Sequence, residues 1–416
     1  MSGGERVATR LLVRDLAQLA SPAGQAAPLR ADALRDVALT EGAYILCEDG
    51  RIAAIGRMRD LGAMENDVEE VDGRGLAAIP GLVDCHTHAA FAGDRVEEFS
   101  LRAAGASYEE LHARGGGILS TVRATRAAGE DGLAEALARH VEWMLRAGTT
   151  TFEAKSGYGL DRETELAQLR AVRAAGGSAT FLGAHAVPPE FADAGADAYV
   201  DFLVEDVLPE AATIAEAADV FLERGAFGAD QARRYLDACA QAGLALRLHG
   251  DQFTESGAIP LAIELGARSV DHLEATGRTG VAALAASEVT GVLLPASALF
   301  LGRPMPPARG LVDAGAAVAL ATDFNPGSAF CESLPLVCSL AATQMGLAPE
   351  EALSACTVNA AHVLGRADRK GRLAAGFDAD VLLIAADDWR HLAYHLGGPV
   401  VHTVIRGGEI AWSSAA

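Results

Sequence analysis

The stretch Gly81-Leu-Val-Asp-Cys-His-Thr-His-Ala-Ala-Phe-Ala-Gly-Asp-Arg95 carries two histidines, one residue apart, at the end of an apolar run. In a β-strand, residues i and i+2 point to the same face, so His86 and His88 would present two imidazoles close enough to share one metal ion. Taken alone, they could equally be two loop histidines that make ordinary hydrogen bonds. A pair supplies only half of a metal-ligand shell, so a metal site requires further ligands elsewhere in the chain.

Short apolar stretches alternate with longer helical patterns from about residue 77 to residue 325. The stretches rich in Val, Leu, Ala and Thr predict strands near residues 78–86, 148–155, 179–186, 218–223, 244–249, 268–272, 290–295 and 317–322. The alanine-rich segments between them include 161–176, 228–242 and 255–266, which have apolar residues at helical spacing and Gly at their exits. Eight strands, each followed by a helix, predict a (β/α)8 TIM-like barrel, which the uneven intervals make somewhat distorted.

The two ends of the chain have a strand pattern without long helices. Strands are predicted at 9–14, 42–48 and 51–56, joined by turns such as Glu48-Asp-Gly-Arg51, and again within 371–384 and at 400–405. We therefore predict a small β-sandwich domain formed from both termini. Residues 1–76 and 371–416 would supply this domain, and residues 77–370 would form the barrel.

Composition excludes several classes of protein. With 50% apolar residues the chain is not disordered, and a net charge of −22 repels nucleic acid and anionic membranes. The six cysteines lie far apart with no CxxC, which argues against a zinc knuckle and a disulfide framework. No leader pattern and no apolar run of about 18 residues is visible, so we expect a soluble, cytoplasmic protein.

Polar residues stand where several predicted barrel strands end. His249 ends Ala245-Leu-Arg-Leu-His249, His272 ends Ser269-Val-Asp-His272, and Asp323 ends Val318-Ala-Leu-Ala-Thr-Asp323. Reactive groups of such barrels sit at the C-terminal ends of the strands. Each residue alone could be a satisfied structural residue, but together with the His-Thr-His pair they indicate a metal site.

At this point the chain resembles the amidohydrolase superfamily over nearly all of its 416 residues. The resemblance rests on Pro80-Gly-Leu-Val-Asp-Cys-His-Thr-His88, on the strand-end residues and on Gly371–Asp380. A narrower resemblance, to the branch that opens imidazolone rings in histidine degradation, rests on Glu153-Ala-Lys-Ser-Gly-Tyr-Gly-Leu160, Gly183-Ala-His-Ala-Val-Pro188, His249-Gly-Asp-Gln252 and Asp323-Phe-Asn-Pro-Gly-Ser328.

The resemblance implies that one divalent metal, zinc or iron, is held by His86, His88, His249 and Asp323. Three imidazoles and one carboxylate suit a borderline metal that activates water near neutral pH. The catalytic candidates implied by the resemblance are His272, which would orient or deprotonate that water, together with Asp323 and with His185, which would donate to the oxyanion formed on attack. Many relatives bridge two metals with a carboxylated lysine on the fourth strand, but Lys155 falls on the second, which favours one metal.

The resemblance also implies a set of substrate-binding residues, Arg95, Tyr158, His185, Asn325, Gly327 and Ser328, to which the side-chain chemistry of Gln252 adds a further candidate. The planar fork of Arg95 suits a propionate carboxylate, although an Asp-Arg pair is more often a solvated surface feature. Asn-Pro-Gly could equally be a plain turn. Gln252 stands where related deaminases have a proton-shuttling glutamate, and it could bind the ring edge or merely orient its neighbours.

The implied activity is hydrolysis of the ring amide bond of 4-imidazolone-5-propanoate to N-formimino-L-glutamate by metal-activated water. Two alternatives remain open, a deaminase of another heterocycle and a non-catalytic relative that serves as a scaffold. The expected partner is a small-molecule substrate with a carboxylate, with no nucleic acid or membrane, and the family suggests a homodimer.

Overall fold

The computed structural model describes residues 10–64, 67–105 and 116–414. By contacts the chain divides into two compact units. Unit 1 comprises Met1–Val83, Met144–Thr151 and Ser333–Ala416, and unit 2 comprises Asp84–Trp143 and Phe152–Glu332.

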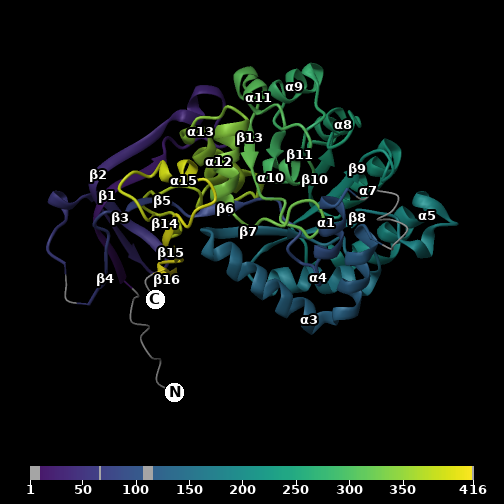
Figure 1. The fold of residues 1–416 in the computed structure, drawn as a ribbon, viewed down its shortest axis with the longest axis horizontal. Helices are drawn as coiled ribbons and strands as arrows, with labels where there is room; N and C mark the ends of the chain where they lie inside the picture. Colours follow the sequence, from purple (N-terminus) through teal and green to yellow (C-terminus); the bar gives the residue numbers. More distant parts are fainter. Residues whose placement is uncertain (1–9, 65–66, 106–115, 415–416) are drawn as a thin grey trace. The chain divides into compact units, whose positions relative to one another are not determined.

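The barrel is a parallel sheet of eight strands in the order β13-β12-β11-β10-β9-β8-β7-β6, which confirms the predicted barrel (Figure 1). Its strands are β6 (Leu82–Asp84), β7 (Thr149–Lys155), β8 (Ser178–Ala184), β9 (Ala217–Leu222), β10 (Ala245–Gly250), β11 (Ser269–His272), β12 (Thr290–Leu293) and β13 (Val318–Leu320). Nearly every residue of these strands is buried, as expected where a parallel sheet is covered on both faces. The apolar runs in the sequence therefore correspond to barrel strands.

Helices follow the strands along the chain. Their bounds are α1 (Val96–Ala103), α3 (Ile118–Arg146), α4 (Arg162–Ala174), α5 (Gly195–Phe202), α6 (Leu208–Ala211), α7 (Ala229–Gln241), α8 (Ala258–Leu265), α9 (Arg278–Ala285), α10 (Pro295–Phe300) and α11 (Ala308–Ala314). Short 3-10 or π turns lie at Pro189–Phe191 and Leu203–Val207. The start of α4 follows from its sequence, since Asp161 accepts a hydrogen bond from the backbone N–H of Thr164 at 2.7 Å.

The first and last strands of the barrel meet just beyond their regular parts. The backbone N–H of Asp323 donates to the carbonyl of His86 at 3.1 Å, and that of His88 donates to the carbonyl of Phe324 at 3.0 Å. Closure therefore brings the His-Thr-His pair beside Asp323, although they are far apart in the sequence.

The prediction of one strand at 78–86 is wrong. The structure has β5 (Ala77–Pro80), which belongs to the sheet of unit 1, and then β6 after a break at Gly81. A Cβ at Gly81 would lie 2.4 Å from Oγ1 of Thr150, so only a glycine fits at the break between the two strands.

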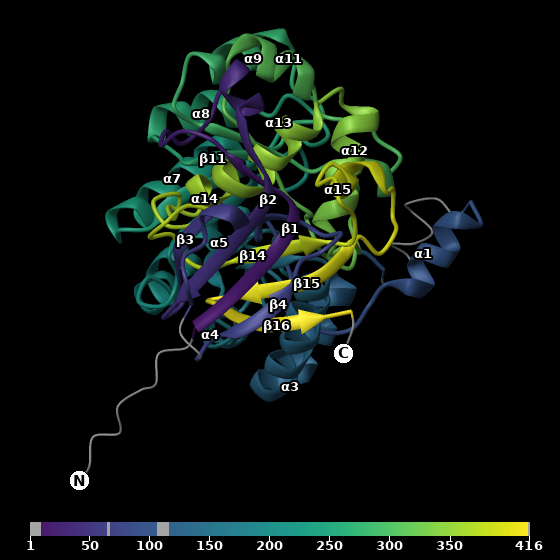
Figure 2. The same ribbon diagram turned by 90° about the vertical axis from the view of Figure 1, so that its left-hand side faces the viewer.

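The sheet of unit 1 joins strands from both ends of the chain, as predicted for the small β-domain (Figure 2). Its strands are β1 (Arg10–Pro22), β2 (Val37–Glu48), β3 (Arg51–Arg57), β4 (Glu69–Asp72), β5, β14 (Val381–Ile384), β15 (Val401–Arg406) and β16 (Glu409–Ser413). One apolar core, which includes Leu16, Ile45, Val381 and Ile405, lies among strands of both chain ends. The same unit contains 3-10 turns at Ala31–Arg35 and Met58–Asp60, a π turn at Ala355–Asn359, and α12 (Leu334–Gln344), α13 (Pro349–Ser354), α14 (Ala360–Val363) and α15 (His391–Tyr394).

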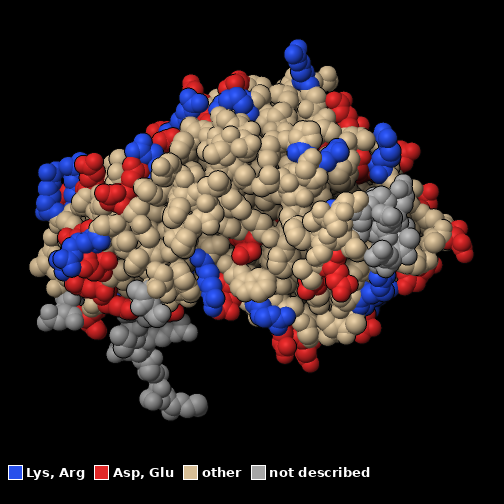
Figure 3. Space-filling model, in the orientation of Figure 1, with Lys and Arg blue, Asp and Glu red and all other residues tan. Residues whose placement is uncertain are grey.

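Acidic and basic side chains are mixed along the margins of the face shown in Figure 3, whose middle is mostly uncharged. Among the described residues, no helix combines the length and the apolar character needed to cross a bilayer.

Candidate active site

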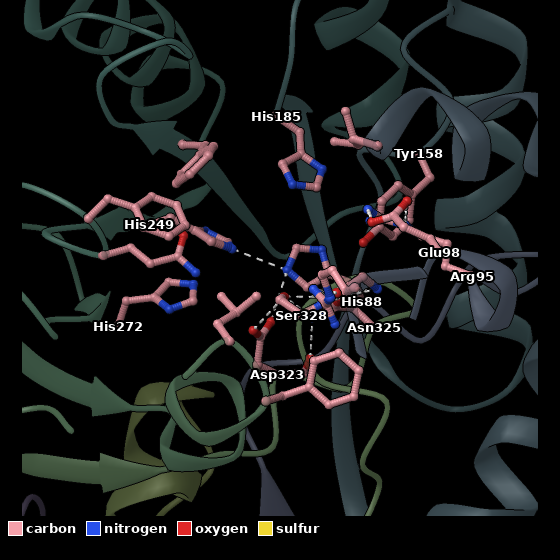
Figure 4. A pocket seen from close by; sticks show the side chains of 18 residues that line it. His88, Arg95, Glu98, Tyr158, His185, His249, His272, Asp323, Asn325 and Ser328 are labelled. Atoms are coloured by element: carbon pink, nitrogen blue, oxygen red, sulfur yellow. Dashed lines mark hydrogen bonds and ion pairs between the residues drawn. The ribbon is translucent and has the colours of Figure 1, made fainter. Parts of the chain in front are cut away.

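The predicted site residues lie around one cavity of about 480 Å³ in unit 2. Its lining includes eleven of them: His88, Arg95, Tyr158, His185, His249, Gln252, His272, Asp323, Asn325, Gly327 and Ser328. Figure 4 shows His249 and His272 at one side and Arg95 and Tyr158 at the other, with His88 and Asp323 between them. His86 is fully buried, and the centroid of its ring lies 4.5 Å from that of His249 with the two rings tilted by 58°, so it also belongs to this group.

The predicted metal ligands fall in two overlapping groups that could hold an ion, His86 with His88 and Asp323, and His86 with His249 and His272. Nε2 of His86 and Nε2 of His88 each lie 3.5 Å from Oδ1 of Asp323, and the Nε2 atoms of His88 and His249 are 3.2 Å apart. Ligands that surround one ion tetrahedrally at about 2.0–2.1 Å are separated by about 3.3–3.4 Å. The spacing of these atoms therefore fits a single small cation.

The protonation of this group also fits a metal. Burial lowers the pKa of His86 and His88 well below the ordinary range and that of His249 to about 4, so the rings are neutral and keep a lone pair. Among the described residues, Nε2 of His86 and Nδ1 of His88 have no hydrogen-bond partner. Unpartnered buried nitrogens are costly, and an ion between the rings would satisfy Nε2 of His86.

Carboxylates behind two of these histidines set their orientation. Nδ1 of His86 lies 2.6 Å from Oδ2 of Asp271, and Nδ1 of His249 lies 3.1 Å from Oδ1 of Asp219. Such partners fix the ring tautomer and leave Nε2 for the ion. Sequence reasoning gave neither carboxylate this role, although a charged residue within an apolar strand is a usable signal.

A cluster of buried charges continues behind these carboxylates. Nζ of Lys155 lies 2.8 Å from Glu153 and 2.9 Å from Asp219, and Arg247 lies 2.9 Å from Glu153. Burial lowers the pKa of Lys155, but the carboxylates of Glu153 and Asp219 outweigh this effect and raise the pKa above its usual value. Burial raises the pKa of Asp271, and the charge of Lys155 opposes this rise.

His272 and Asp323 have strained backbones. Their φ angles are 86° and 56°, in the left-handed region that non-glycine residues rarely adopt. Strain of this kind persists where the surroundings over-determine the conformation, and it concentrates at functional sites.

His272 lies beside the ligand group and faces a carboxylate on its far side. One ring nitrogen of His272 lies within 4.8 Å of ligand atoms of His86 and His249, while Nδ1 is 3.4 Å from Glu274. Burial lowers the pKa of His272, but Glu274 and Asp323 outweigh it and raise the pKa. His272 is thus placed to exchange a proton at Nε2.

His185 presents a bare nitrogen to the cavity. Its Nδ1 lies 2.9 Å from the carbonyl of Gly157, to which it donates, and burial lowers its pKa to about 4. A neutral ring with Nδ1 engaged offers Nε2 as an acceptor. This favours the predicted contact with the substrate ring over the predicted donation to a developing oxyanion.

Arg95 is not a solvated surface residue, because its side chain is 15% exposed and pairs with Glu98. Nε of Arg95 donates to Glu98 at 3.0 Å. Glu98 also accepts from the backbone N–H of Gly117 at 2.8 Å, and Arg102 lines the same end of the cavity. Sequence reasoning missed Glu98 and Arg102, although Glu98 stands three residues after Arg95, a spacing that joins side chains on a helix.

The Asn-Pro-Gly segment is both a turn and part of the cavity wall. Oδ1 of Asn325 accepts from the backbone N–H groups of Gly327 and Ser328, each at 2.8 Å. Nδ2 of Asn325 donates to the carbonyl of Asp323 at 2.6 Å. The turn thus fixes this loop against a predicted metal ligand.

Comparison with known proteins places this site in a family. The Amidohydrolase family model matches residues 77–411. A curated imidazolonepropionase of Rubrobacter xylanophilus is 60% identical over 412 residues, which cover 97% of this chain and 98% of the relative. The chain belongs to the imidazolonepropionases of the amidohydrolase family.

Further likenesses agree with the amidohydrolase assignment. A curated imidazolonepropionase of Chloroflexus aggregans is 46% identical over 96% of this chain and 98% of its own. A guanine deaminase structure from C. acetobutylicum superposes with a TM-score of 0.72 at 15% identity, covering 97% of this chain and 100% of that one. At that identity the likeness concerns the fold alone.

Amidohydrolases are metal-dependent, and this member has a His/Asp group whose atoms can hold an ion. A metal site at this position is therefore expected on both grounds.

Proposed function

We propose that this chain hydrolyses the ring amide bond of 4-imidazolone-5-propanoate to N-formimino-L-glutamate, a step of histidine degradation. The observation that carries the assignment is 60% identity, over 97% of the chain, to a curated imidazolonepropionase. The chain is a metal-dependent hydrolase that acts on a cyclic amide.

We further propose that the cofactor is one divalent ion per chain, zinc or iron, held by His86, His88, His249 and Asp323. Among the described residues, the groups that could hold an ion share His86, and the spacing of their Nε2 and Oδ1 atoms supports one ion. When bound, the ion would polarise the ring carbonyl and lower the pKa of water.

The other side chains have distinct proposed tasks. His272 receives the proton of the attacking water at Nε2, because Glu274 engages its Nδ1 side. Nε2 of His185 accepts from a ring N–H. Gln252, which lines the cavity, both donates and accepts and so complements the edge of an imidazolone ring.

Recognition of the propionate falls to the opposite end of the cavity. Arg95 lies there, across from His249 and His272 (Figure 4), and Asn325 and Ser328 line the same cavity. A guanidinium pairs with a carboxylate through parallel N–H groups, which fixes both position and direction of the substrate. The loop of Asn325, Gly327 and Ser328 would contact the product as its new carboxylate forms.

The proposed partner is the carboxylate-bearing substrate alone, without nucleic acid or membrane. The negative charge of the chain supports this exclusion. A homodimer stays a prediction, which light scattering of the purified protein would test.

One experiment tests the activity directly. Purified protein is mixed with 4-imidazolone-5-propanoate, and the loss of substrate is followed by ultraviolet absorbance. The mass of the product is measured by mass spectrometry, and the metal content of the same protein sample is analysed. We expect addition of one water without release of ammonia, and about one ion per chain. Release of ammonia from guanine or cytosine with no ring opening would favour the deaminase alternative instead.

A further inference from the structure

Lys155 is a buried cation that the proposed reaction does not use. It lies at the end of β7 with 0% of its side chain exposed, in the same strand as Glu153. A buried ammonium group is expensive unless it is paired, so its neighbours indicate its task.

The ammonium group of Lys155 lies near the two carboxylates that face the proposed metal ligands His249 and His86. Nζ of Lys155 is 2.9 Å from Oδ2 of Asp219 and 3.9 Å from Oδ2 of Asp271. Asp219 faces Nδ1 of His249 at 3.1 Å, and Asp271 faces Nδ1 of His86 at 2.6 Å. One lysine on β7 therefore connects strand β9 with strand β11, and through their carboxylates it reaches two ligand histidines.

The carboxylates behind His86 and His249 determine which nitrogen of each ring carries the proton. An ionised carboxylate can only accept, so it requires a proton on Nδ1 and leaves a lone pair on Nε2. Nε2 is the atom that each ring presents to the ligand group: that of His86 lies 3.5 Å from Asp323, and that of His249 lies 3.2 Å from Nε2 of His88. The carboxylates therefore favour the tautomer with the proton on Nδ1, which leaves the lone pair of Nε2 for a metal.

We propose that Lys155 is a positioning residue of the metal site, whose ammonium group holds Asp219 and Asp271 in place so that His249 and His86 keep Nε2 free for the ion. The proposal rests on the metal site of the proposed function and is independent of the substrate.

The charges around Lys155 support this role over that of a metal-bridging carboxylated lysine. Carboxylation would replace a cation by an anion among Glu153, Asp219 and Asp271, which already lie within 3.9 Å of Nζ. If Lys155 is removed, Glu153 keeps the contact with Arg247 at 2.9 Å, whereas the two carboxylates behind the histidines lose this ammonium group. Breaking a buried ionic group in this way leaves uncompensated charge.

The test compares Lys155→Met with Arg372→Met, which removes another largely buried cation, 3% exposed and in unit 1. Zinc affinity of the metal-stripped proteins is measured by competition with a chelator. We expect Lys155→Met to weaken zinc binding roughly 10- to 100-fold, the range for loss of a partner behind a ligand, and Arg372→Met to change it less than about twofold.

A second readout is the tautomer of the histidines in the metal-free protein, from ¹⁵N spectra of histidine-labelled samples. The rings of His86 and His249 are expected to carry their proton on Nδ1 in the wild type and to lose this preference in Lys155→Met, whereas His185, whose Nδ1 faces the Gly157 carbonyl, should keep it. Asp219→Asn should change the signal of His249 alone, and Asp271→Asn that of His86 alone. Unchanged tautomers and zinc affinity in folded Lys155→Met would overturn the proposal, even if the enzyme opens imidazolone rings.

A measurement without a change at Lys155 covers the case in which Lys155→Met does not fold. Lys155 and Lys370 are the lysines of the chain, so Lys370→Arg leaves Lys155 as the source of any ¹⁵N-lysine side-chain signal. We expect an ammonium signal protected from exchange with water that shifts in Asp219→Asn. A neutral amine or a carbamate at this position would refute the role.

Discussion

The substitution Gly327→Ala would test whether Arg95 holds the substrate carboxylate, because it adds one methyl group beside the guanidinium. A Cβ at Gly327 would lie 2.0 Å from Nη1 and 3.0 Å from Cζ of Arg95. Ordinary contact begins near 3.4 Å, so the guanidinium would have to retreat by about 1.4 Å. The loop cannot yield easily, because Asn325 accepts from the backbone N–H groups of Gly327 and Ser328.

In Gly327→Ala we therefore expect a normal fold and metal content with a large loss of recognition. The guanidinium is the far end of a flexible side chain, so its displacement costs little stability. Misplacement of a substrate-orienting group by about 1 Å can cost about 10²-fold, which corresponds to roughly 2.7 kcal/mol in kcat/KM. Most of the loss should appear in KM, as measured by ultraviolet absorbance of the substrate.

Two further variants show whether the effect runs through Arg95. Gly310→Ala places a methyl group on α11 with nothing within 4 Å and should match the wild type. Arg95→Met should raise KM by removing a desolvated charge pair worth about 2–5 kcal/mol, and adding Gly327→Ala to it should cost little more. A wild-type KM in Gly327→Ala, or full additivity in the double variant, would refute this reasoning.

Other side chains of the site give distinct expectations. His249→Ala should lose both bound metal and activity, and about two ions per active chain in the wild type would contradict the single-ion site. His272→Asn should keep its metal while turnover falls by about two orders of magnitude or more, whereas unaltered turnover would remove His272 from proton transfer. Gln252→Leu should lower kcat/KM with metal retained, and a kcat/KM equal to that of the wild type would leave Gln252 an orienting residue at most. Burial raises the pKa of Asp323 to about 6. Because a protonated carboxyl is no ligand, the zinc affinity of the metal-free protein should fall as the pH drops below about 6. Chelator competition measured across that range would give a flat profile if Asp323 does not bind the ion.

The sequence by itself determined the barrel and much of its rim. Apolar stretches at intervals are local signals, and β7 to β12 lie where those signals placed them. A polar residue that ends an apolar strand is also a local signal, and the strand-end positions of His249 and His272 could therefore be predicted. The exception among the strands is 78–86, which divides at Gly81 into strands of two different sheets, and Thr150 approaches this glycine closely, a contact that the sequence does not display.

Only the tertiary structure decided which charges meet. The contacts of Lys155 with Asp219 and Asp271 join three strands, and they depend on the register of the sheet and on which side chains the barrel turns inward. The sequence shows each charge but not its partner, because pairing across strands is set by closure and not by spacing along the chain. The same holds at the other end of the cavity, where the approach of Gly327 to Arg95 exists only once the barrel has brought the two loops together.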